Sequence, residues 1–286
     1  IVVEDNEIPT VTCPADITVS TDEELCTAVV IWTIPTSADN CSVASITSDS
    51  NSGDIFQLGT TTVTYTITDP SGNSTECSFD VTVEDSENPN ITCPADITVD
   101  TELGVCEAAV TWGDPIFSDN CAGSTINSTM SSGDVFPLGA TVVTYTVTDG
   151  SGNTAECSFT VTVEDNEPPT VICPDDVTVD TDPGECTAVV TWDVPPPSSD
   201  NCGFFGINSN FQSGDAFPVG TTVVTFMLTD PAGNTTECSF TVTVEDNEPQ
   251  EMVCQDDIIN VFTDPGECSA VVTFSLPLIT DNCETT

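Results

Sequence analysis

The chain has 286 residues, of which 48 are Asp or Glu and none is Lys, Arg or His, so its formal charge is −48. Nucleic acid and anionic membrane surfaces are excluded as partners, because proteins bind both through positive charge. Without basic side chains no carboxylate can form a side-chain ion pair, so divalent cations are the natural partners that remain. Hydrophobic residues still make up 38% of the chain, which is enough to build folded cores and argues against charge-driven disorder.

The predicted elements follow one another in a fixed order. Residues 1–7 read IVVEDNE and match the end of a repeat, such as VTVEDNE at 161–167. CPADITV (13–19), CTAVVIW (26–32), TTVTYTITD (61–69) and ECSFDVTVED (76–85) come next, with a DN dipeptide before Cys41. Apolar residues alternate with polar ones in these segments, and DPSGN (69–73) and SGD (52–54) are turn signals, so the pattern predicts β-strands joined by tight turns.

The whole pattern returns with a period of 80 or 81 residues, since the first cysteines of the units are Cys13, Cys93, Cys173 and Cys254. We therefore expect tandem domains and a window on a longer array. The predicted boundaries are 1–7 for the end of a preceding repeat with its linker, 8–86, 87–166 and 167–247 for three repeats, and 248–286 for a partial fourth.

Six or seven short strands in each unit favour an all-β fold of tandem, disulfide-stapled, immunoglobulin-like β-sandwiches. An up-and-down barrel fits less well, because the strands are uneven in length and spacing. Trp32, Trp112 and Trp192 recur at the end of the second predicted strand and are expected to fill the space between the sheets.

Each complete unit carries four cysteines, and the fifteen in the chain include no C-x-x-C pair. Disulfides in an oxidising, extracellular compartment therefore fit better than a zinc site. Four cysteines allow three pairings. We favour first with third, at one pole of a sandwich, and second with fourth, between the sheets. The expected pairs are Cys13 with Cys41, Cys26 with Cys77, Cys93 with Cys121, Cys106 with Cys157, Cys173 with Cys202, and Cys186 with Cys238.

Acidic and amide residues from three segments of each unit are expected at one pole, beside the loop between the first two strands of the preceding domain. Calcium takes six to eight oxygen ligands, and these side chains supply them. The alternative is that Asp, Asn and Gly simply form turns. The predicted ligands are Asp5, Glu7, Asp39, Asn40 and Asp69, then Asp85, Glu87, Asp119, Asn120 and Asp149, then Asp165, Glu167, Asp200, Asn201 and Asp230.

N-glycosylation signals occur at five asparagines. Those at Asn40, Asn73 and Asn234 compete with the calcium prediction, so we predict modification at Asn90 and Asn127.

With these motifs in place, the units resemble hyalin repeats. The shared features are CPADITV, the cysteine that opens the second strand, the DNC loop, and the GN turn before ECSFTVTV, and they cover nearly the whole chain. The resemblance implies an immunoglobulin-like fold and a role in extracellular adhesion or matrix, with no catalysis.

The predicted function is a non-enzymatic structural subunit of an extracellular fibre or matrix: a rod of domains stiffened by disulfides and calcium, with no organic cofactor. An enzyme is disfavoured because the carboxylates repeat with the fold and no His or Lys supplies a base. The alternative is the stalk of a cell-surface adhesin that presents a ligand-binding domain outside this chain. The predicted partners are other copies, head to tail or laterally in filaments, divalent cations and glycans.

Overall fold

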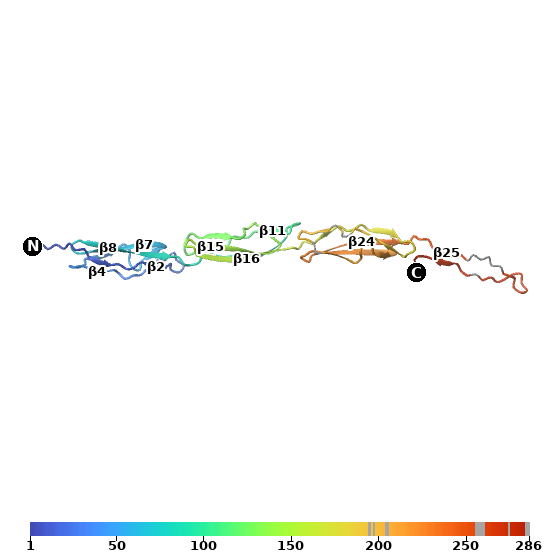
Figure 1. Cartoon of the computed structure of the whole chain (residues 1–286), viewed down its shortest axis with the longest axis horizontal. Helices are drawn as coiled ribbons and strands as arrows, with labels where there is room; N and C mark the ends of the chain where they lie inside the picture. The colour runs from blue at the N-terminus through green and yellow to red at the C-terminus, as the bar shows by residue number, and fades with distance from the viewer. Residues whose placement is uncertain (194–195, 197, 204–205, 255–260, 274, 284–286) are drawn as a thin grey trace. The chain divides into compact units, whose positions relative to one another are not determined.

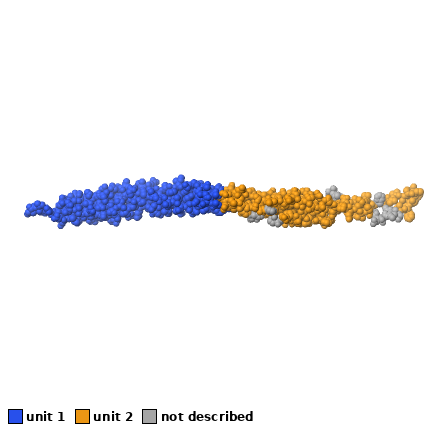
Figure 2. All heavy atoms as spheres, turned by 90° about the horizontal axis from the view of Figure 1, so that it is seen from above, with its two compact units in different colours: residues 1–99, 109–163 blue, residues 100–108, 164–286 orange. Residues whose placement is uncertain are grey.

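The structure is a computed structural model that describes residues 1–193, 196, 198–203, 206–254, 261–273 and 275–283. The regular elements among these residues are strands, and they include no helix that could span a membrane. The chain forms two compact units, coloured separately in Figure 2. One unit contains residues 1–99 and 109–163, and the other contains residues 100–108 and 164–286.

The first repeat is a sandwich built on a four-stranded sheet with the order β2-β8-β7-β5. The strand pairs β1-β4 and β3-β6 complete it. The long strands β7 and β8 lie side by side in Figure 1, and β2 runs parallel to β8 with Ile17 opposite Val81. The strands of this repeat are β1 (Thr10–Thr12), β2 (Ile17–Ser20), β3 (Thr27–Val29), β4 (Thr36–Ala38), β5 (Ser45–Ser48), β6 (Ile55–Gln57), β7 (Gly59–Thr68) and β8 (Ser74–Glu84).

The second and third repeats follow the same plan, with four-stranded sheets ordered β10-β16-β15-β13 and β18-β24-β23-β21. The second contains β9 (Asn90–Thr92), β10 (Ile97–Asp100), β11 (Glu107–Ala109), β12 (Ile116–Ser118), β13 (Thr125–Ser128), β14 (Val135–Pro137), β15 (Gly139–Thr148) and β16 (Thr154–Glu164). The third contains β17 (Thr170–Val171), β18 (Val177–Asp180), β19 (Thr187–Val189), β20 (Ser198–Ser199), β21 (Gly206–Ser209), β22 (Ala216–Pro218), β23 (Gly220–Thr229) and β24 (Thr235–Glu245). The partial fourth repeat contributes the pair β25 (Glu251–Val253) and β26 (Leu278–Thr280).

Apolar and polar residues alternate along the long strands, and the apolar ones form the core. Val63, Tyr65 and Ile67 of β7 are buried while the threonines between them are half-buried. These side chains pack with Val81 of β8 and with Trp32, which confirms the predicted place of the tryptophan between the sheets. Each fully buried aliphatic side chain of this kind stabilises the fold by about 1.5–3 kcal/mol. The all-β, disulfide-stapled sandwich is therefore confirmed.

The favoured cysteine pairing is wrong. Within each complete repeat the first cysteine bonds to the fourth: Cys13 to Cys77, Cys93 to Cys157 and Cys173 to Cys238. The segment after Cys13 runs beside β8, where the Asp16 carboxylate accepts a hydrogen bond from the Asp80 amide at 2.9 Å. This contact places Cys13 next to Cys77, with Cα atoms 5.8 Å apart, and leaves Cys41 without a bond.

Cys26 lies too far from Cys77 along β8 to form a disulfide with it. The loop before Cys26 is held at the far end of that strand, where the Thr21 amide donates to the Glu84 carbonyl at 2.9 Å. Cys77 lies near the other end of β8, and seven residues of strand span roughly 23 Å. A disulfide requires Cα atoms within about 7 Å. Cys26 therefore bonds to Cys121 of the next repeat, and Cys106 and Cys186 bond likewise to Cys202 and Cys283.

Candidate metal centre at the repeat junctions

Three carboxylates from separate segments meet where the first repeat joins the second. Asp85 directly follows β8, Asp119 follows β12, and Asp149 follows β15. Each offers an oxygen within 4.8 Å of the others, with Asp85 and Asp149 buried and Asp119 half-buried. Asp165, Asp200 and Asp230 form the same group between the second and third repeats. The predicted convergence of these aspartates at one pole is therefore what the structure shows.

Several oxygens in these groups are buried, and no residue that the structure describes donates a hydrogen bond to them. At the first junction they are Asp85 Oδ2, Asp119 Oδ1 and Asn120 Oδ1. At the second they are the same atoms of Asp165, Asp200 and Asn201. Buried, unpaired carboxylate oxygens are costly, and the chain has no Lys, Arg or His to neutralise them. A hard cation that prefers oxygen ligands, such as Ca²⁺, fits this donor set.

The third carboxylate is held mainly by its own turn. Asp149 Oδ1 accepts hydrogen bonds from the amides of Ser151, Gly152 and Asn153, and its Oδ2 accepts one from Asn153 Nδ2 at 2.8 Å. Burial raises the pKa of Asp149, but these hydrogen bonds outweigh it, so the pKa lies below its ordinary value. Asn153 Nδ2 also donates to the Asp85 carbonyl at 3.1 Å. The turn therefore keeps a charged carboxylate beside the linker.

In the second group, the acidic side chains around Asp200 repel its negative charge. Burial raises the pKa of Asp200, and the charges of Asp165, Asp230 and Glu167 raise it further. The hydrogen bond that its Oδ2 accepts from the Cys202 amide at 2.9 Å opposes this shift only in part. A bound cation would relieve the repulsion that these carboxylates exert on one another.

The preceding repeat completes each junction through a threonine and a backbone carbonyl. Asn120 Nδ2 donates to Thr21 Oγ1 at 3.3 Å, to the Leu25 carbonyl at 3.1 Å and to Asp85 Oδ1 at 3.3 Å. Asn201 makes the corresponding contacts with Thr101, Val105 and Asp165, and Asn282 contacts Thr181 and Glu185. The recurrence of a threonine one residue after β2 and its counterparts was the available signal for this contact, and the sequence analysis missed it.

Two of the linker glutamates accept hydrogen bonds from a loop of the preceding repeat. The Glu87 carboxylate accepts a hydrogen bond from the Glu24 amide at 3.2 Å, and Glu167 accepts one from the Gly104 amide at 2.9 Å. Glu7 is exposed and its side chain is not part of the group around Asp5. Glu87 and Glu167 therefore hold the linker against the preceding loop, and a role of the three glutamates as cation ligands stays a prediction.

A disulfide crosses each junction beside the carboxylates. Cys121 directly follows Asn120, and its amide donates to Asp119 Oδ2 at 3.0 Å. Its partner Cys26 directly follows Leu25, whose carbonyl accepts the Asn120 hydrogen bond. The covalent bond and the polar site therefore hold the same two loops together.

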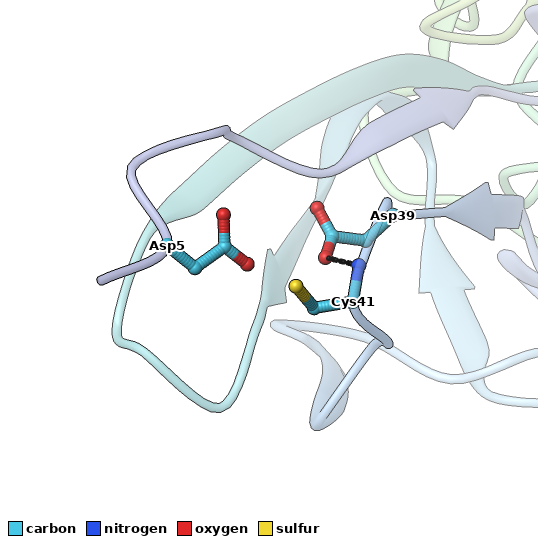
Figure 3. A group of neighbouring side chains, drawn as sticks. All are labelled: Asp5, Asp39 and Cys41. Atoms are coloured by element: carbon cyan, nitrogen blue, oxygen red, sulfur yellow. Dashed lines mark hydrogen bonds between the residues drawn. The ribbon is translucent and has the colours of Figure 1, made fainter. Parts of the chain in front are cut away.

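The first repeat carries a corresponding group of its own. Asp5, Asp39 and Cys41 lie within 4.8 Å of one another, and Figure 3 shows the Cys41 thiol beside both carboxylates. The Cys41 amide donates to Asp39 Oδ2 at 2.9 Å, and Asn40 Nδ2 contacts Asp5 Oδ1 at 3.5 Å. Asp69 is buried and held by its turn with Asn73, outside this group. A hydrogen bond with Asp5, followed by burial and the nearby negative charges, raises the pKa of Cys41.

The predicted glycosylation sites are both on the surface. Asn90 opens β9, Asn127 lies in β13, and both side chains are exposed. Their modification stays a prediction.

A cavity of about 590 Å³ lies in the third repeat. Its lining includes Trp192 and Phe226, and Trp192 Nε1 is buried with no hydrogen-bond partner among the described residues. In the first two repeats this indole nitrogen donates to Tyr65 or Tyr145 at 2.8 Å. Phe226 occupies the tyrosine position in the third repeat, so the acceptor is missing.

Comparison with known proteins agrees with this architecture. The HYR domain family matches residues 4–83, 84–163 and 164–244. Hyalin of Strongylocentrotus purpuratus is 36% identical over 280 residues, covering 94% of this chain and 23% of that protein. Hyalin of Lytechinus variegatus is 37% identical over 289 residues, covering 97% of this chain and 54% of that protein. The chain thus spans about a quarter and about half of the lengths of these relatives.

Among solved structures, extracellular cadherin domains 3–6 of protocadherin gamma B2 align with 90% of this chain and 76% of that one, at 14% identity and a TM-score of 0.32. The family assignment depends on the three consecutive matches and on the two hyalins. The chain belongs to the HYR domain family, and three HYR domains follow one another along it.

Proposed function

We propose that this chain is a structural segment of an extracellular, adhesion-related fibre or matrix, in which calcium and disulfides together fix each repeat to the next. One observation supports the proposal: at two junctions a disulfide between repeats lies beside a group of aspartates. Cys26–Cys121 lies beside the Asp85 group, and Cys106–Cys202 lies beside the Asp165 group. Disulfides persist in oxidising compartments, which supports an extracellular location.

Calcium would reduce the electrostatic repulsion between repeats in such an array. The chain carries a formal charge of −48, and the buried aspartates at the junctions concentrate part of this charge between consecutive repeats. Repulsion of this kind opposes close contact of the repeats. A divalent cation held by Asp85, Asp119 and Asn120 would neutralise the junction and use their unpaired oxygens. The disulfide then keeps the repeats joined when the cation dissociates.

The covalent bonds alone would allow rotation and hinge motion about each linker, whereas a cation bound by both the linker and the loop after β12 would restrict it. We therefore propose that calcium restricts motion between repeats and that the disulfides keep the repeats covalently joined. Surface glycans at Asn90 and Asn127 would cover exposed strands. No catalytic step enters this function.

Calorimetry and solution scattering of the intact chain test the proposal. In millimolar calcium we expect saturable binding, a higher Tm and a narrow distribution of particle dimensions, and in EDTA a lower Tm and a broader distribution. The Asp85→Asn, Asp165→Asn double variant is expected to lose most of the calcium response while its six disulfides form as in the wild type. A chain whose Tm and scattering are the same in calcium and EDTA would refute the role of calcium.

A further inference from the structure

The cavity of about 590 Å³ in the third repeat has a counterpart of about 570 Å³ in the first repeat, but the two are lined differently. The counterpart is lined by Tyr65, whose hydroxyl accepts the hydrogen bond of Trp32 Nε1 at 2.8 Å. In the third repeat Phe226 stands in place of the tyrosine, and Trp192 Nε1 is buried with no partner among the described residues. From this cavity and its unpaired donor we infer that the third repeat binds a neutral sugar residue of a glycan.

Three side chains line this cavity that neither of the other complete repeats has at those positions. Phe226 replaces a tyrosine. Asp193 stands where the first two repeats have threonine and glycine, and Phe211 stands where they have serine and methionine. The three positions are far apart in the sequence and meet only in the folded repeat. Their meeting at one cavity indicates that the chemistry of the cavity has changed as a whole.

The cavity passes from a polar rim to an aromatic interior. Asp193 and Gln212 of its lining are exposed. Trp192 and Phe211 are half-buried, and Phe226 is 2% exposed. A cavity of this volume that combines apolar walls with a few polar groups is typical of a site for a small molecule.

Phe211 does not supply the acceptor that the indole lacks. Its ring packs on Phe217, with centroids 5.0 Å apart and planes tilted by 40°, and its carbonyl accepts a hydrogen bond from Ser209 Oγ. These contacts hold the ring in the wall of the cavity but bring no oxygen to Trp192 Nε1. A buried donor without an acceptor is destabilising. A ligand oxygen at the place of the missing tyrosine hydroxyl would satisfy it.

The groups around the cavity select the class of ligand. Trp192 Nε1 can only donate, so the ligand must present an acceptor, which an ammonium group does not have. The Asp193 carboxylate can only accept, and it repels anionic ligands together with the chain's formal charge of −48. Sugar hydroxyls both donate and accept, and the C–H face of a sugar ring can pack against the Phe211 ring. A neutral sugar therefore suits each of these groups.

This inference goes beyond the proposed function and does not depend on it. The residues that line the cavity belong neither to the aspartate groups nor to the disulfides of the junctions. Sugar binding should therefore be the same in calcium and in EDTA, whether or not calcium stabilises the junctions.

NMR of the intact chain tests the inference, because its three tryptophans, one in each complete repeat, give separate indole N–H signals. The probes are galactose, glucose, mannose and N-acetylglucosamine, with glucuronic acid and choline as charged comparison ligands. We expect at least one neutral sugar to shift the Trp192 signal saturably and to leave the Trp32 and Trp112 signals in place. A Trp192→Phe variant identifies the signal by its loss.

Two variants make the test specific. Phe226→Tyr places a hydroxyl where the ligand oxygen should bind, so it should weaken sugar affinity at least about tenfold while raising the Tm of the third repeat. Asp193→Ala removes a charged acceptor and should weaken affinity by about tenfold or more. Asp114→Ala, at an exposed position of the second repeat, is the matched control and should bind as the wild type does.

Four results would overturn the inference. They are the absence of any shift with the neutral sugars, equal shifts of all three indole signals, a shift of the Trp192 signal by the charged ligands alone, and unchanged sugar affinity in Phe226→Tyr and Asp193→Ala.

Discussion

Replacing Asp119 by asparagine should change the stability of the first junction with opposite sign in EDTA and in calcium. The substitution keeps the acceptor for the Cys121 amide, because an asparagine oxygen can take the place of Oδ2. It exchanges the unpaired Oδ1 for an NH₂ group, which is a hydrogen-bond donor beside the remaining carboxylates. It also removes one of three negative charges.

The apo-state gain can be estimated from the geometry. Carboxylate oxygens of Asp85, Asp119 and Asp149 lie within 4.8 Å of one another, so Asp119→Asn removes two repulsive pairs. Each pair is worth about 1 kcal/mol in a water-like dielectric and about 3.5 kcal/mol at an effective dielectric constant of about 20. In EDTA the variant should therefore be more stable than the wild type by roughly 2 kcal/mol or more, and added salt should reduce the gain.

In calcium the wild type should be more stable than the Asp119→Asn variant. A ligand present at about 100 times its Kd stabilises the folded state by about 2.7 kcal/mol, and the variant loses a charged ligand and much of that term. The readout is hydrogen exchange at residues 21–26 and 119–121, with calorimetry in parallel, because a chain of several repeats does not unfold in one two-state step. Asp114→Asn is the matched control, since Asp114 is exposed in the same repeat and its loss changes the net charge equally. A shift of the same sign with and without calcium would refute the reasoning.

Three further perturbations test separate parts of the structure. Phe226→Tyr should raise the free energy of unfolding of the third repeat by roughly 1–2 kcal/mol, because it restores an acceptor for the buried Trp192 Nε1; an unchanged or lower Tm of that repeat would contradict this. The Cys106→Ala, Cys202→Ala double variant should lose up to about 4.7 kcal/mol, since the bond closes a loop with a sequence separation of 96, and unfolding monitored in calcium measures the loss. Asp176 accepts an amide hydrogen bond from β24 at 2.7 Å, which holds its pKa below the ordinary 3.8, so its stabilisation is complete above that value and disappears as pH falls through the lower folded-state pKa. Asp176→Asn should therefore flatten the acid limb of the stability curve, and acid titrations of both proteins that run parallel would count against this assignment.

The fold was predictable because its signals are local and repeated. Alternation in 61–69 and 77–83 fixes which side chains enter the core, and Val63, Ile67 and Val81 are buried accordingly. The GN turn between these strands predicts the β7–β8 hairpin, which the structure contains. The convergence of Asp85, Asp119 and Asp149 was also predictable, since strand ends and loops on one pole of a sandwich must lie near one another.

The cysteine pairing was not predictable in the same way. Counting four cysteines per repeat suggests two bonds per repeat, and both of the favoured pairs close within one domain. In the structure, one bond lies within each repeat and the other joins neighbouring repeats. Only the position of Cys26 at the far end of β8 separates this pairing from the favoured one. The parallel pairing of β2 with β8 determines that position, and it depends on long-range register that residue spacing does not reveal.

The shared bond changes which part of the chain acts as one unit. Residues 100–108, the loop of the second repeat that contains Cys106, group with residues 164–286 and not with the sheet that precedes and follows them in sequence. The loop is tied to the linker by the Thr101–Glu164 and Gly104–Glu167 hydrogen bonds, and to the third repeat by its disulfide. The junctions therefore contribute to the stability of the chain as well as the sandwiches, and a repeat removed from its neighbour loses a disulfide and an asparagine contact together.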